Sequence, residues 1–366
     1  MSKKFMTILM KPASSLCNLN CKYCFYNDTA KNRETASFGI MSEGTVNAII
    51  EKSLEYVDGG GVNYSFQGGE PTVAGLDFFK KFVEIVNAKN LNKTAVTYAL
   101  QTNGTLLDDA FCEFFKTNNF LIGISIDGKS ETHNANRLYK DGKGTFNKVM
   151  QAVDCLKKHK VEFNVLTVVN SKSKKKAKET YNFFVSHGIN YLQFITCLEP
   201  IGSLPFSSGF AIDNDGYFEY YKTLLDLYVA DKRNGKDVSI RYFDNLLGML
   251  NGENPELCGM NGHCNCQLVI EGNGNCYPCD FYCEDKYLLG NINADDLTEM
   301  ATSENAKAFL TPSYQIDEKC KTCAVANLCR GGCRRERDYF SDGKLNLNIY
   351  CEGRKKFFEY LTTLLR

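Results

Sequence analysis

Three cysteines near the N-terminus constrain this chain more than any other feature. Cys17, Cys21 and Cys24 stand in the run Cys-Asn-Leu-Asn-Cys-Lys-Tyr-Cys, directly after a short apolar segment. Three thiolates at these spacings can bind three irons of a four-iron cluster, and they leave the last iron without a protein ligand. A structural metal site fills its coordination, whereas a site built for chemistry keeps one position open. The spacing therefore predicts a cluster that binds and activates a further molecule.

Cysteine is also the compositional outlier of the chain. There are 17 cysteines, an odd number, and only 4 histidines. Without a secretion signal, this composition argues against a disulfide framework and indicates a reducing, cytoplasmic compartment, where clustered thiols more often bind metal. Ligation by thiolates alone favours iron–sulfur clusters, with zinc as the competitor.

Length and charge exclude several classes of protein. The chain has 366 residues and is 43% hydrophobic, enough for one large domain with a smaller one attached. Lys+Arg and Asp+Glu both number 43, so no overall charge favours nucleic acid or an anionic membrane. No apolar run approaches the roughly 20 residues of a membrane helix, and no signal-peptide cleavage site follows the start. We expect neither a nucleic-acid nor a membrane partner.

Short apolar runs alternate with amphipathic stretches between residues 5 and 200. The runs predict strands at Thr7–Met10, Tyr64–Phe66, Ala95–Gln101, Leu121–Ile126, Glu162–Val169 and Tyr191–Ile195. Ser42 is a predicted helix N-cap, and a longer helix is predicted over Asp215–Lys232, ended by Gly235. Alternation of this kind predicts an α/β domain with a parallel sheet, open or partly closed as a barrel.

The character of the sequence changes after Pro255. Eleven of the cysteines lie between Cys258 and Cys351, and Gly272-Asn-Gly274 is a hairpin signal. We therefore predict a core domain over residues 1–235, a linker over 236–257, and a loop-rich second domain over 258–366 that ends in a helix.

The N-terminal motif resembles the radical S-adenosylmethionine (SAM) superfamily. Gln67-Gly68-Gly69-Glu70-Pro71 matches that family's Gly-Gly-Glu-Pro loop, whose glycines let the backbone approach a ligand's ammonium group. The resemblance implies a partial (β/α)6 barrel, with SAM chelated to the open iron of a [4Fe-4S] cluster and cleaved to a 5′-deoxyadenosyl radical. It also implies these SAM-binding residues: Tyr23, Gly68, Gly69, Glu70, Ser125, Arg137 and Leu198. Taken singly, Ser125 could equally be a strand residue, Arg137 a surface charge and Leu198 a core residue.

The C-terminal cysteines resemble the SPASM extension of radical SAM maturases, which holds two auxiliary [4Fe-4S] clusters. The motif is Cys320-x2-Cys323-x5-Cys329-x3-Cys333, followed by Cys351. The resemblance assigns one cluster to Cys258, Cys264, Cys279 and Cys333, and the other to Cys320, Cys323, Cys329 and Cys351. Spacing alone leaves open Cys264 or Cys266, and Cys279 or Cys276. A zinc-ribbon-like module is the alternative, and nearby arginines are expected to offset the negative charge of the clusters.

Three further motifs closely resemble the anaerobic sulfatase-maturating enzymes, and the similarity runs over nearly the whole chain. They are Pro-Cys-Asp-Phe-Tyr at 278–282, Cys-Phe-Tyr at 24–26 and Cys-Gly-Met-Asn-Gly at 258–262. The resemblance implies oxidation of a cysteine or serine side chain in a sulfatase to Cα-formylglycine. Asp280 is then the catalytic base, Tyr26 helps to hold the substrate or the base, and an electron leaves to an auxiliary cluster. A flavodoxin- or ferredoxin-type donor and an oxygen-poor cytoplasm complete this hypothesis.

Other functions remain open on the sequence. A related enzyme could instead install thioether or carbon–carbon crosslinks, or epimerise a residue, in a ribosomal peptide. Because the first predicted strand begins at Thr7, we expect no precursor-binding N-terminal domain, which favours the sulfatase hypothesis. A non-catalytic zinc-binding scaffold and a ferredoxin-like electron carrier are hypotheses of other classes. Asp280 itself could be a turn or cap residue.

Overall fold

The structure is a computed structural model that describes residues 3–339 and 344–364. The chain forms two compact units, and each combines segments that lie far apart in the sequence. Unit 1 comprises Met1–Ser125, Arg137–Phe163 and Cys266–Phe309, and unit 2 comprises Ile126–Asn136, Asn164–Asn265 and Leu310–Arg366. The domain boundaries predicted at residues 235 and 258 stay a prediction, and their outer ends at residues 1 and 366 lie outside the described residues.

Unit 1 contains a sheet in which β1 is central to the site described below. Its strands follow the order β10-β9-β8-β1-β2-β3-β4. Strands β1 to β4 and β8 run parallel, whereas β9 is antiparallel to β8 and β10 is antiparallel to β9. The bounds are β1 Phe5–Met10, β2 Gly61–Phe66, β3 Ala95–Thr102, β4 Phe120–Ser125, β8 Val269–Ile270, β9 Asn275–Tyr277 and β10 Gly290–Asn291.

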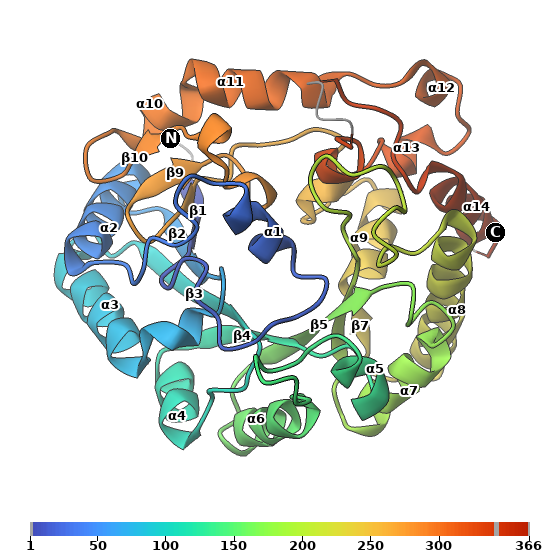
Figure 1. The fold of residues 1–366 in the computed structure, drawn as a ribbon, viewed down its shortest axis with the longest axis horizontal. Helices are drawn as coiled ribbons and strands as arrows, with labels where there is room; N and C mark the ends of the chain where they lie inside the picture. Colours follow the sequence, from blue (N-terminus) through green and yellow to red (C-terminus); the bar gives the residue numbers. More distant parts are fainter. Residues whose placement is uncertain (1–2, 340–343, 365–366) are drawn as a thin grey trace. The chain divides into compact units, whose positions relative to one another are not determined.

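Helices cover the sheet of unit 1 on one side, and α1 lies on the other side (Figure 1). Neighbouring helices pack in the order α2, α3, α4 and α6. The α-helices are α1 Phe25–Lys31, α2 Glu43–Val57, α3 Leu76–Lys89, α4 Asp109–Thr117, α6 Phe146–Lys158, α10 Leu297–Thr302 and α11 Glu304–Leu310. Short 3-10 turns are η1 Pro71–Ala74, η3 Asp280–Tyr282 and η4 Asp285–Tyr287.

Local sequence signals explain these elements. The Ser42 side chain caps α2 by accepting a hydrogen bond from the Thr45 amide at 3.1 Å. The apolar residues of α2 recur on one face of the helix, and that face is buried. Each of the six predicted strands is present and begins or ends within three residues of the predicted bounds. The α/β prediction with a parallel sheet is therefore confirmed.

Unit 2 is built from three short parallel strands and a set of helices. The strands are β5 Phe163–Val169, β6 Tyr191–Thr196 and β7 Ser239–Ile240, in that order. The helices are α5 Ser130–Asn134, α7 Ala177–Ser186, α8 Asn214–Arg233, α9 Arg241–Leu250, α12 Glu318–Lys321, α13 Ala326–Cys329 and α14 Cys351–Leu364, with 3-10 turns η2 Cys258–Met260, η5 Thr311–Tyr314 and η6 Arg334–Glu336.

Aromatic packing joins the C-terminal helix of unit 2 to the rest of that unit. The ring of Phe357 on α14 stacks on Tyr242 of α9 at 6.0 Å and meets Tyr221 of α8 edge-on at 6.1 Å. Tyr350, just before α14, stacks on Tyr217 at 5.2 Å. Buried aromatic pairs of this kind stabilise a fold beyond their area burial, so α14 is an integral part of unit 2.

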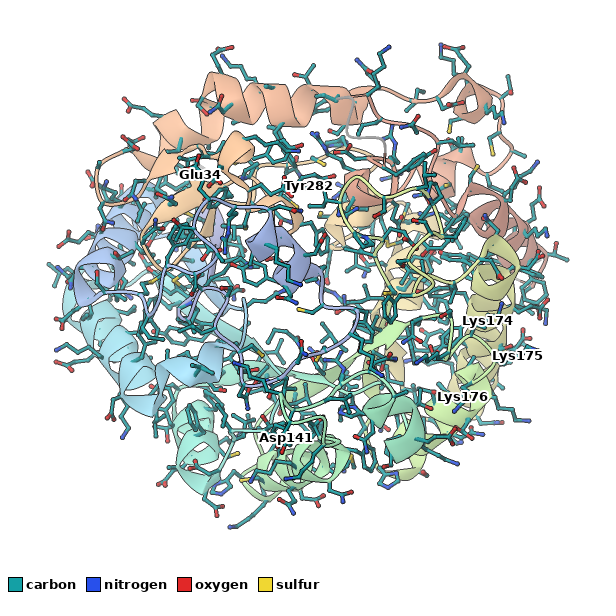
Figure 2. The ribbon with its side chains drawn as sticks, in the orientation of Figure 1. Glu34, Asp141, Lys174, Lys175, Lys176 and Tyr282 are labelled. Carbon is teal, nitrogen blue, oxygen red and sulfur yellow. The ribbon has the colours of Figure 1, made fainter. Side chains whose placement is uncertain are left out.

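The run Lys174–Lys176, labelled in Figure 2, directly precedes α7. Lys174 pairs with Asp213 at 2.8 Å and Lys176 lies near Glu131 at 3.4 Å, so the run begins a helix and has local partners. Among the described residues, no helix is long and apolar enough to cross a membrane.

Candidate functional site

The carboxyl ends of three neighbouring strands bring Lys11, Gln67 and Glu271 together. Met10 of β1 pairs with Phe66 of β2 and with Ile270 of β8, and each of the three polar residues directly follows one of these partners. The register therefore places the three side chains at one edge of the sheet. In parallel α/β proteins this edge is where ligands bind.

Asp280 lies at this edge and is held by two donors. Its carboxylate accepts hydrogen bonds from the Lys11 ammonium and, at 2.8 Å, from Gln67 Nε2. The Lys11 side chain is fully buried, and that of Asp280 is 10% exposed. Burial alone would lower the pKa of Lys11, but the charge of Asp280, helped by Cys283 and Glu271, raises this pKa above its ordinary value. The lysine is therefore a permanent cation beside the carboxylate.

A second buried network surrounds Tyr26. The Tyr26 hydroxyl donates to the carboxylate of Glu271, which also pairs with Arg33 at 2.7 Å. The Lys11 ammonium lies 3.9 Å from the centre of the Tyr26 ring, so the ring connects the two networks. Burial raises the pKa of Tyr26 well above its usual range, which keeps the phenol protonated. Tyr26 is thus positioned by Lys11 and Glu271 within the same site as Asp280.

The cysteine loop of residues 17–24 leads directly into this site. Cys24 is the N-cap of α1, and it packs against the buried cluster that contains Tyr26 and Cys283. Phe25 of α1 meets Phe281 edge-on at 4.9 Å, next to Asp280. The amide of Leu19 points at the Cys17 sulfur at 3.4 Å, and burial raises the pKa of the Cys17 thiol to about 11. A bound metal would have to displace that proton.

The glycines of the Gly-Gly-Glu-Pro loop allow this loop to lie against the cysteine loop. The Gly69 amide donates to the Ser14 carbonyl at 2.8 Å, and the Glu70 amide donates to the Leu16 carbonyl at 2.8 Å. A Cβ atom on Gly69 would lie 2.7 Å from the Ser15 carbonyl carbon and nearer still to the Leu16 oxygen. Gly68 has φ of +133°, a conformation that favours glycine. Both glycines are therefore required by the close approach of the two loops.

Glu70 is a buried anchor for the same loop. Its carboxylate accepts four hydrogen bonds, from the Thr72 amide and hydroxyl, the Thr102 hydroxyl and the Asn103 amide, at 2.6 to 3.0 Å. Burial raises its pKa, and these hydrogen bonds oppose that rise. Glu70 thus ties the loop after β2 to the end of β3, where Asn103 also approaches the Cys17 sulfur at 3.9 Å.

Two further predicted SAM-binding residues of unit 1 lie near these strand ends. Ser125 ends β4, and its hydroxyl accepts a hydrogen bond from Gln101 of β3 at 3.0 Å. The guanidinium of Arg137 lies 5.5 Å from the centre of the Tyr23 ring, so a buried cation sits beside the cysteine loop. Leu198 belongs to unit 2, where its carbonyl accepts from the Cys197 thiol at 3.7 Å.

In unit 2, one predicted cysteine set lines a cavity. Cys320, Cys329 and Cys351 lie in its wall together with Arg337, and Cys323 is close enough to Cys320 and Cys351 to raise the pKa of both thiols. Burial is the larger cause of both shifts. Three thiols and an arginine that line one cavity, with a fourth thiol close by, suit a fully ligated four-iron cluster.

The other predicted cysteine set draws on both units. Cys258, Cys264 and Cys333 belong to unit 2 and influence one another's ionisation, whereas Cys279 belongs to unit 1. Burial raises the pKa of Cys264, and the positive charges of Arg334 and Arg337 oppose that rise.

Cys266 and Cys276, the two alternative ligands that the spacing leaves open, lie in unit 1. Cys266 is close enough to affect Cys276, which is fully buried on β9 and has a pKa raised to about 12, chiefly by burial.

Sequence reasoning missed Lys11, Arg33 and Glu271 as parts of the site. Lys11 carried a usable signal, because a charged residue directly after the predicted strand Thr7–Met10 points to a ligand-binding edge. Glu271 carried none, because the two-residue strand before it was not predicted. Arg33 carried none, since its partner Glu271 is 238 residues away.

The donor sets fit iron–sulfur clusters better than zinc. The N-terminal loop offers three thiols, and the cavity of unit 2 is surrounded by thiols without histidine. The backbone of the Gly-Gly-Glu-Pro loop lies against the cysteine loop, and a buried arginine lies beside the same loop. These features suit a ligand with ammonium and carboxylate groups.

Comparison with known proteins gives consistent results for both parts of the chain. The family model of the Radical SAM superfamily matches residues 12–184, and that of the SPASM iron-sulfur cluster-binding domain matches residues 258–324. A cysteine-type anaerobic sulfatase-maturating enzyme of Clostridium novyi (strain NT) is 43% identical over 97% of this chain and 95% of the relative. A serine-type enzyme of Bacteroides thetaiotaomicron is 34% identical over 98% of this chain and 90% of the relative.

A solved structure extends the similarity to the fold. It is described as native anSMEcpe with bound AdoMet and Cp18Cys peptide, and it is 42% identical to this chain. The match has a TM-score of 0.94 and covers 99% of this chain and 98% of that one.

Proposed function

Because this chain belongs to the family of anaerobic sulfatase-maturating enzymes, we propose that it oxidises a cysteine side chain of a sulfatase polypeptide to Cα-formylglycine. It is a radical SAM oxidoreductase with a SPASM domain. The observation that carries the proposal is the buried carboxylate of Asp280, which Lys11 and Gln67 hold at the strand edge beside the cysteine loop.

Cysteine is the proposed target in preference to serine. The cysteine-type relatives are 42–43% identical to this chain, whereas the serine-type relatives reach 34%. Chemistry supports the same choice, since a thiol with a pKa near 8.5 gives up its proton to an ordinary carboxylate base.

Residues of unit 1 are proposed to hold the first cluster and SAM. Cys17, Cys21 and Cys24 bind the cluster, and the Gly68–Gly69 backbone accepts from the ammonium group of SAM. Tyr23, Ser125 and Arg137, with Leu198 of unit 2, complete the proposed SAM contacts, while Glu70 fixes the loop. When bound, the cluster and SAM supply a 5′-deoxyadenosyl radical, which removes a hydrogen atom from the substrate Cβ.

Asp280 is proposed to accept the proton of the substrate thiol. The Lys11 ammonium pairs with this carboxylate, and Gln67 fixes its orientation. The Tyr26 ring lies on the buried side of the site, and its hydroxyl donates a hydrogen bond to Glu271. One electron must also leave the substrate, and an auxiliary cluster would accept it. The substrate is then a thioaldehyde, which water converts to the aldehyde with release of H2S.

The remaining cysteines are proposed to hold two auxiliary [4Fe-4S] clusters. One set is Cys320, Cys323, Cys329 and Cys351, supported by the cavity that three of them line. The other is Cys258, Cys264, Cys279 and Cys333, and the mutual influence of its three members in unit 2 supports Cys264 over Cys266. A flavodoxin- or ferredoxin-type protein is the proposed electron donor, in an oxygen-poor cytoplasm.

The test is anaerobic incubation of the reconstituted enzyme with SAM, dithionite and a Cys-x-Pro-x-Arg peptide, followed by mass spectrometry. The expected peptide product has lost H2S and gained one oxygen atom. In Asp280→Asn, which keeps the size of the side chain, product should fall at least ~100-fold while 5′-deoxyadenosine is still released. Asp285→Asn, an exposed carboxylate in the next turn, is the control and should keep full activity.

Other outcomes would overturn the proposal. Loss of only a pair of hydrogen atoms from the peptide indicates a crosslinking enzyme, and an unchanged mass with inverted chirality indicates an epimerase. Stoichiometric zinc without iron would leave only a scaffold. Full activity of Asp280→Asn would remove Asp280 from the role of base.

A further inference from the structure

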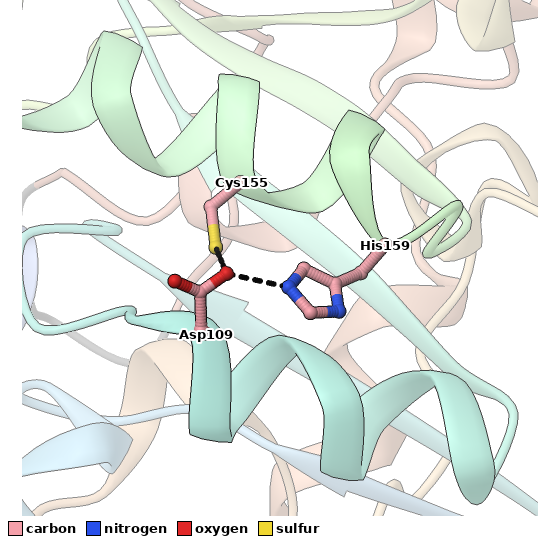
Figure 3. Close-up of side chains that lie close together, drawn as sticks. All are labelled: Asp109, Cys155 and His159. Carbon is pink, nitrogen blue, oxygen red and sulfur yellow. Dashed lines mark hydrogen bonds and ion pairs between the residues drawn. The ribbon is translucent and has the colours of Figure 1, made fainter.

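A second group of metal-binding side chains lies on the helical side of unit 1, outside the site described above (Figure 3). Asp109 begins α4, Cys155 lies on α6, and His159 is the C-cap of α6. One carboxylate oxygen of Asp109 accepts from His159 Nε2 at 2.6 Å and from the Cys155 thiol at 3.7 Å. All three ligand atoms lie within 4.8 Å of one another.

The helical spacing explains why the group converges. Cys155 and His159 are four residues apart, so they lie on the same face of α6. Asp109 and Cys112 are three residues apart on α4, which packs against α6. Cys112 is fully buried and its thiol interacts with that of Cys155, but it lies outside the group of three converging ligands.

The donor types are those of a zinc site. One sulfur, one imidazole nitrogen and one carboxylate oxygen form a three-ligand set. Zinc accepts such a set in tetrahedral geometry when water takes the fourth position. Bond lengths of about 2.0 to 2.3 Å separate tetrahedral ligand atoms by roughly 3.3 to 3.8 Å. The Cys155–Asp109 separation already has this value, and the His159–Asp109 separation is shorter. Because the Asp109 side chain is 65% exposed, it is free to turn and open that gap.

A lysine now occupies part of the place that a cation would take. The Lys158 ammonium lies 2.6 Å from the same Asp109 oxygen, and its side chain is 66% exposed. A metal ion would have to displace this ammonium, which can move into solvent at little cost. Removal of the Lys158 ammonium should therefore strengthen metal binding, whereas removal of a ligand should weaken it.

We propose that Asp109, Cys155 and His159 form a binding site for Zn2+ that links α4 to α6, with water as the fourth ligand. The site is separate in its residues from the cysteines assigned to the iron–sulfur clusters, and it takes no part in the oxidation reaction. Its role is to fasten two neighbouring helices of unit 1, and binding releases the proton of the Cys155 thiol.

Zinc binding is measured by anaerobic equilibrium dialysis of the holoenzyme, whose cluster cysteines are already occupied by iron. Wild type should bind one additional Zn2+ per chain with no loss of iron. Cys155→Ser and His159→Gln should each bind zinc more weakly, by more than the ~10–100-fold that loss of an outer-shell partner costs. Lys158→Ala should bind it more tightly. His187→Gln, which changes the corresponding C-cap histidine of α7, should behave like wild type.

Location is tested by anomalous diffraction from zinc-soaked crystals of the holoenzyme, recorded on both sides of the zinc absorption edge. The expected peak lies between α4 and α6 and disappears in Cys155→Ser. Zinc that binds only by displacing iron, a peak elsewhere, or equal affinity in all four variants would overturn the proposal. A Cys112–Cys155 disulfide in anaerobically purified protein would overturn it too. Because formylglycine formation is assayed separately, failure here leaves the proposed function untouched.

Discussion

At the level of single residues, the ion pair between Lys11 and Asp280 dominates the site. Both side chains are almost entirely removed from water. Breaking a buried pair by removing one partner leaves the other charge without compensation, which costs far more than the loss of an exposed pair. Because folding raises the pKa of Lys11, the pair contributes its stability at every pH below the ordinary lysine value of about 10.4. That contribution is lost only as the pH rises through the folded value.

Lys11→Met therefore tests the residue that positions the proposed base. We expect the free energy of unfolding to fall by about 3 kcal/mol in urea titrations near neutral pH. We also expect formylglycine formation to fall while 5′-deoxyadenosine is still released, because the carboxylate has lost one of the two donors that hold it in place.

The control for this variant is Lys80→Met, which removes an exposed lysine paired with Asp77. It should change stability by less than ~1 kcal/mol and leave formylglycine formation unchanged. Normal formylglycine formation by folded Lys11→Met would show that the lysine is structural only.

The chemistry of these residues was predictable to different extents. Asp280 and the cysteines stand in short motifs, so their types and spacing identify them from the sequence. Lys11 and Glu271 become neighbours only through the strand register, because Met10 pairs with Ile270 and each of the two charged residues follows one of them. Arg33 depends on a contact with a residue 238 positions away, which no local pattern reveals.

At the level of elements, two loops that are distant in sequence fit each other closely. The Gly-Gly-Glu-Pro loop donates two backbone hydrogen bonds to residues 14 and 16, directly before the first cysteine. Glu70 fixes the other side of the loop through four hydrogen bonds. The position of the cysteine loop therefore depends on the shape of the glycine loop.

Gly69→Ala should disturb this fit, because the added Cβ would overlap the backbone of residues 15 and 16. We expect the N-terminal cluster to assemble poorly, so that iron falls by about a third from about twelve per chain and release of 5′-deoxyadenosine is lost.

Gly44→Ala, on α2, is the matched control, since a Cβ there would meet only the Ser42 hydroxyl at 3.7 Å. Its iron content should equal that of wild type. Normal iron and normal SAM cleavage in Gly69→Ala would contradict the role given to the contact between the two loops.

Regular elements were the most predictable part of the fold. Alternation of apolar residues located the six longer strands, and the Asp215–Lys232 prediction matches α8 to within one residue at each end. The short strands β7 to β10 have only two or three residues each, too few for a periodic pattern. Periodicity alone does not fix the inward face of α8, where Phe218 is only partly buried and Tyr217 and Tyr220 are buried. Tyr217 stacks on Tyr350 and Tyr220 meets Phe194 of β6, and these contacts join residues that are distant in sequence.

At the level of the whole molecule, the chain separates its proposed tasks between two units. Unit 1 contains the three N-terminal cysteines and Asp280, and unit 2 contains a complete cysteine set for one auxiliary cluster. Cys351 is the first residue of α14, so that cluster would fasten the C-terminal helix to α12 and α13, which carry Cys320 and Cys329.

Cys351→Ser is expected to loosen this region without disturbing unit 1. Iron should fall by about four atoms per chain. In hydrogen-exchange mass spectrometry, peptides from α14 and residues 320–329 should exchange faster, while peptides from β1 and β2 serve as the internal reference and should not change. Equal protection of α14 in the variant and in wild type would show that aromatic packing alone holds the helix.

The position of β1 between β2 and β8 has a consequence for the folding of the chain. One neighbour of β1 follows within about sixty residues, but the other comes more than 250 residues later, so pairing on that side has high contact order and forms late. Until Val269 and Ile270 arrive, that edge of β1 exposes unpaired backbone groups, a template for aggregation. A fragment that stops before residue 269 should therefore self-associate when it is produced alone, and chaperones that shield strand edges should improve the yield of the intact chain.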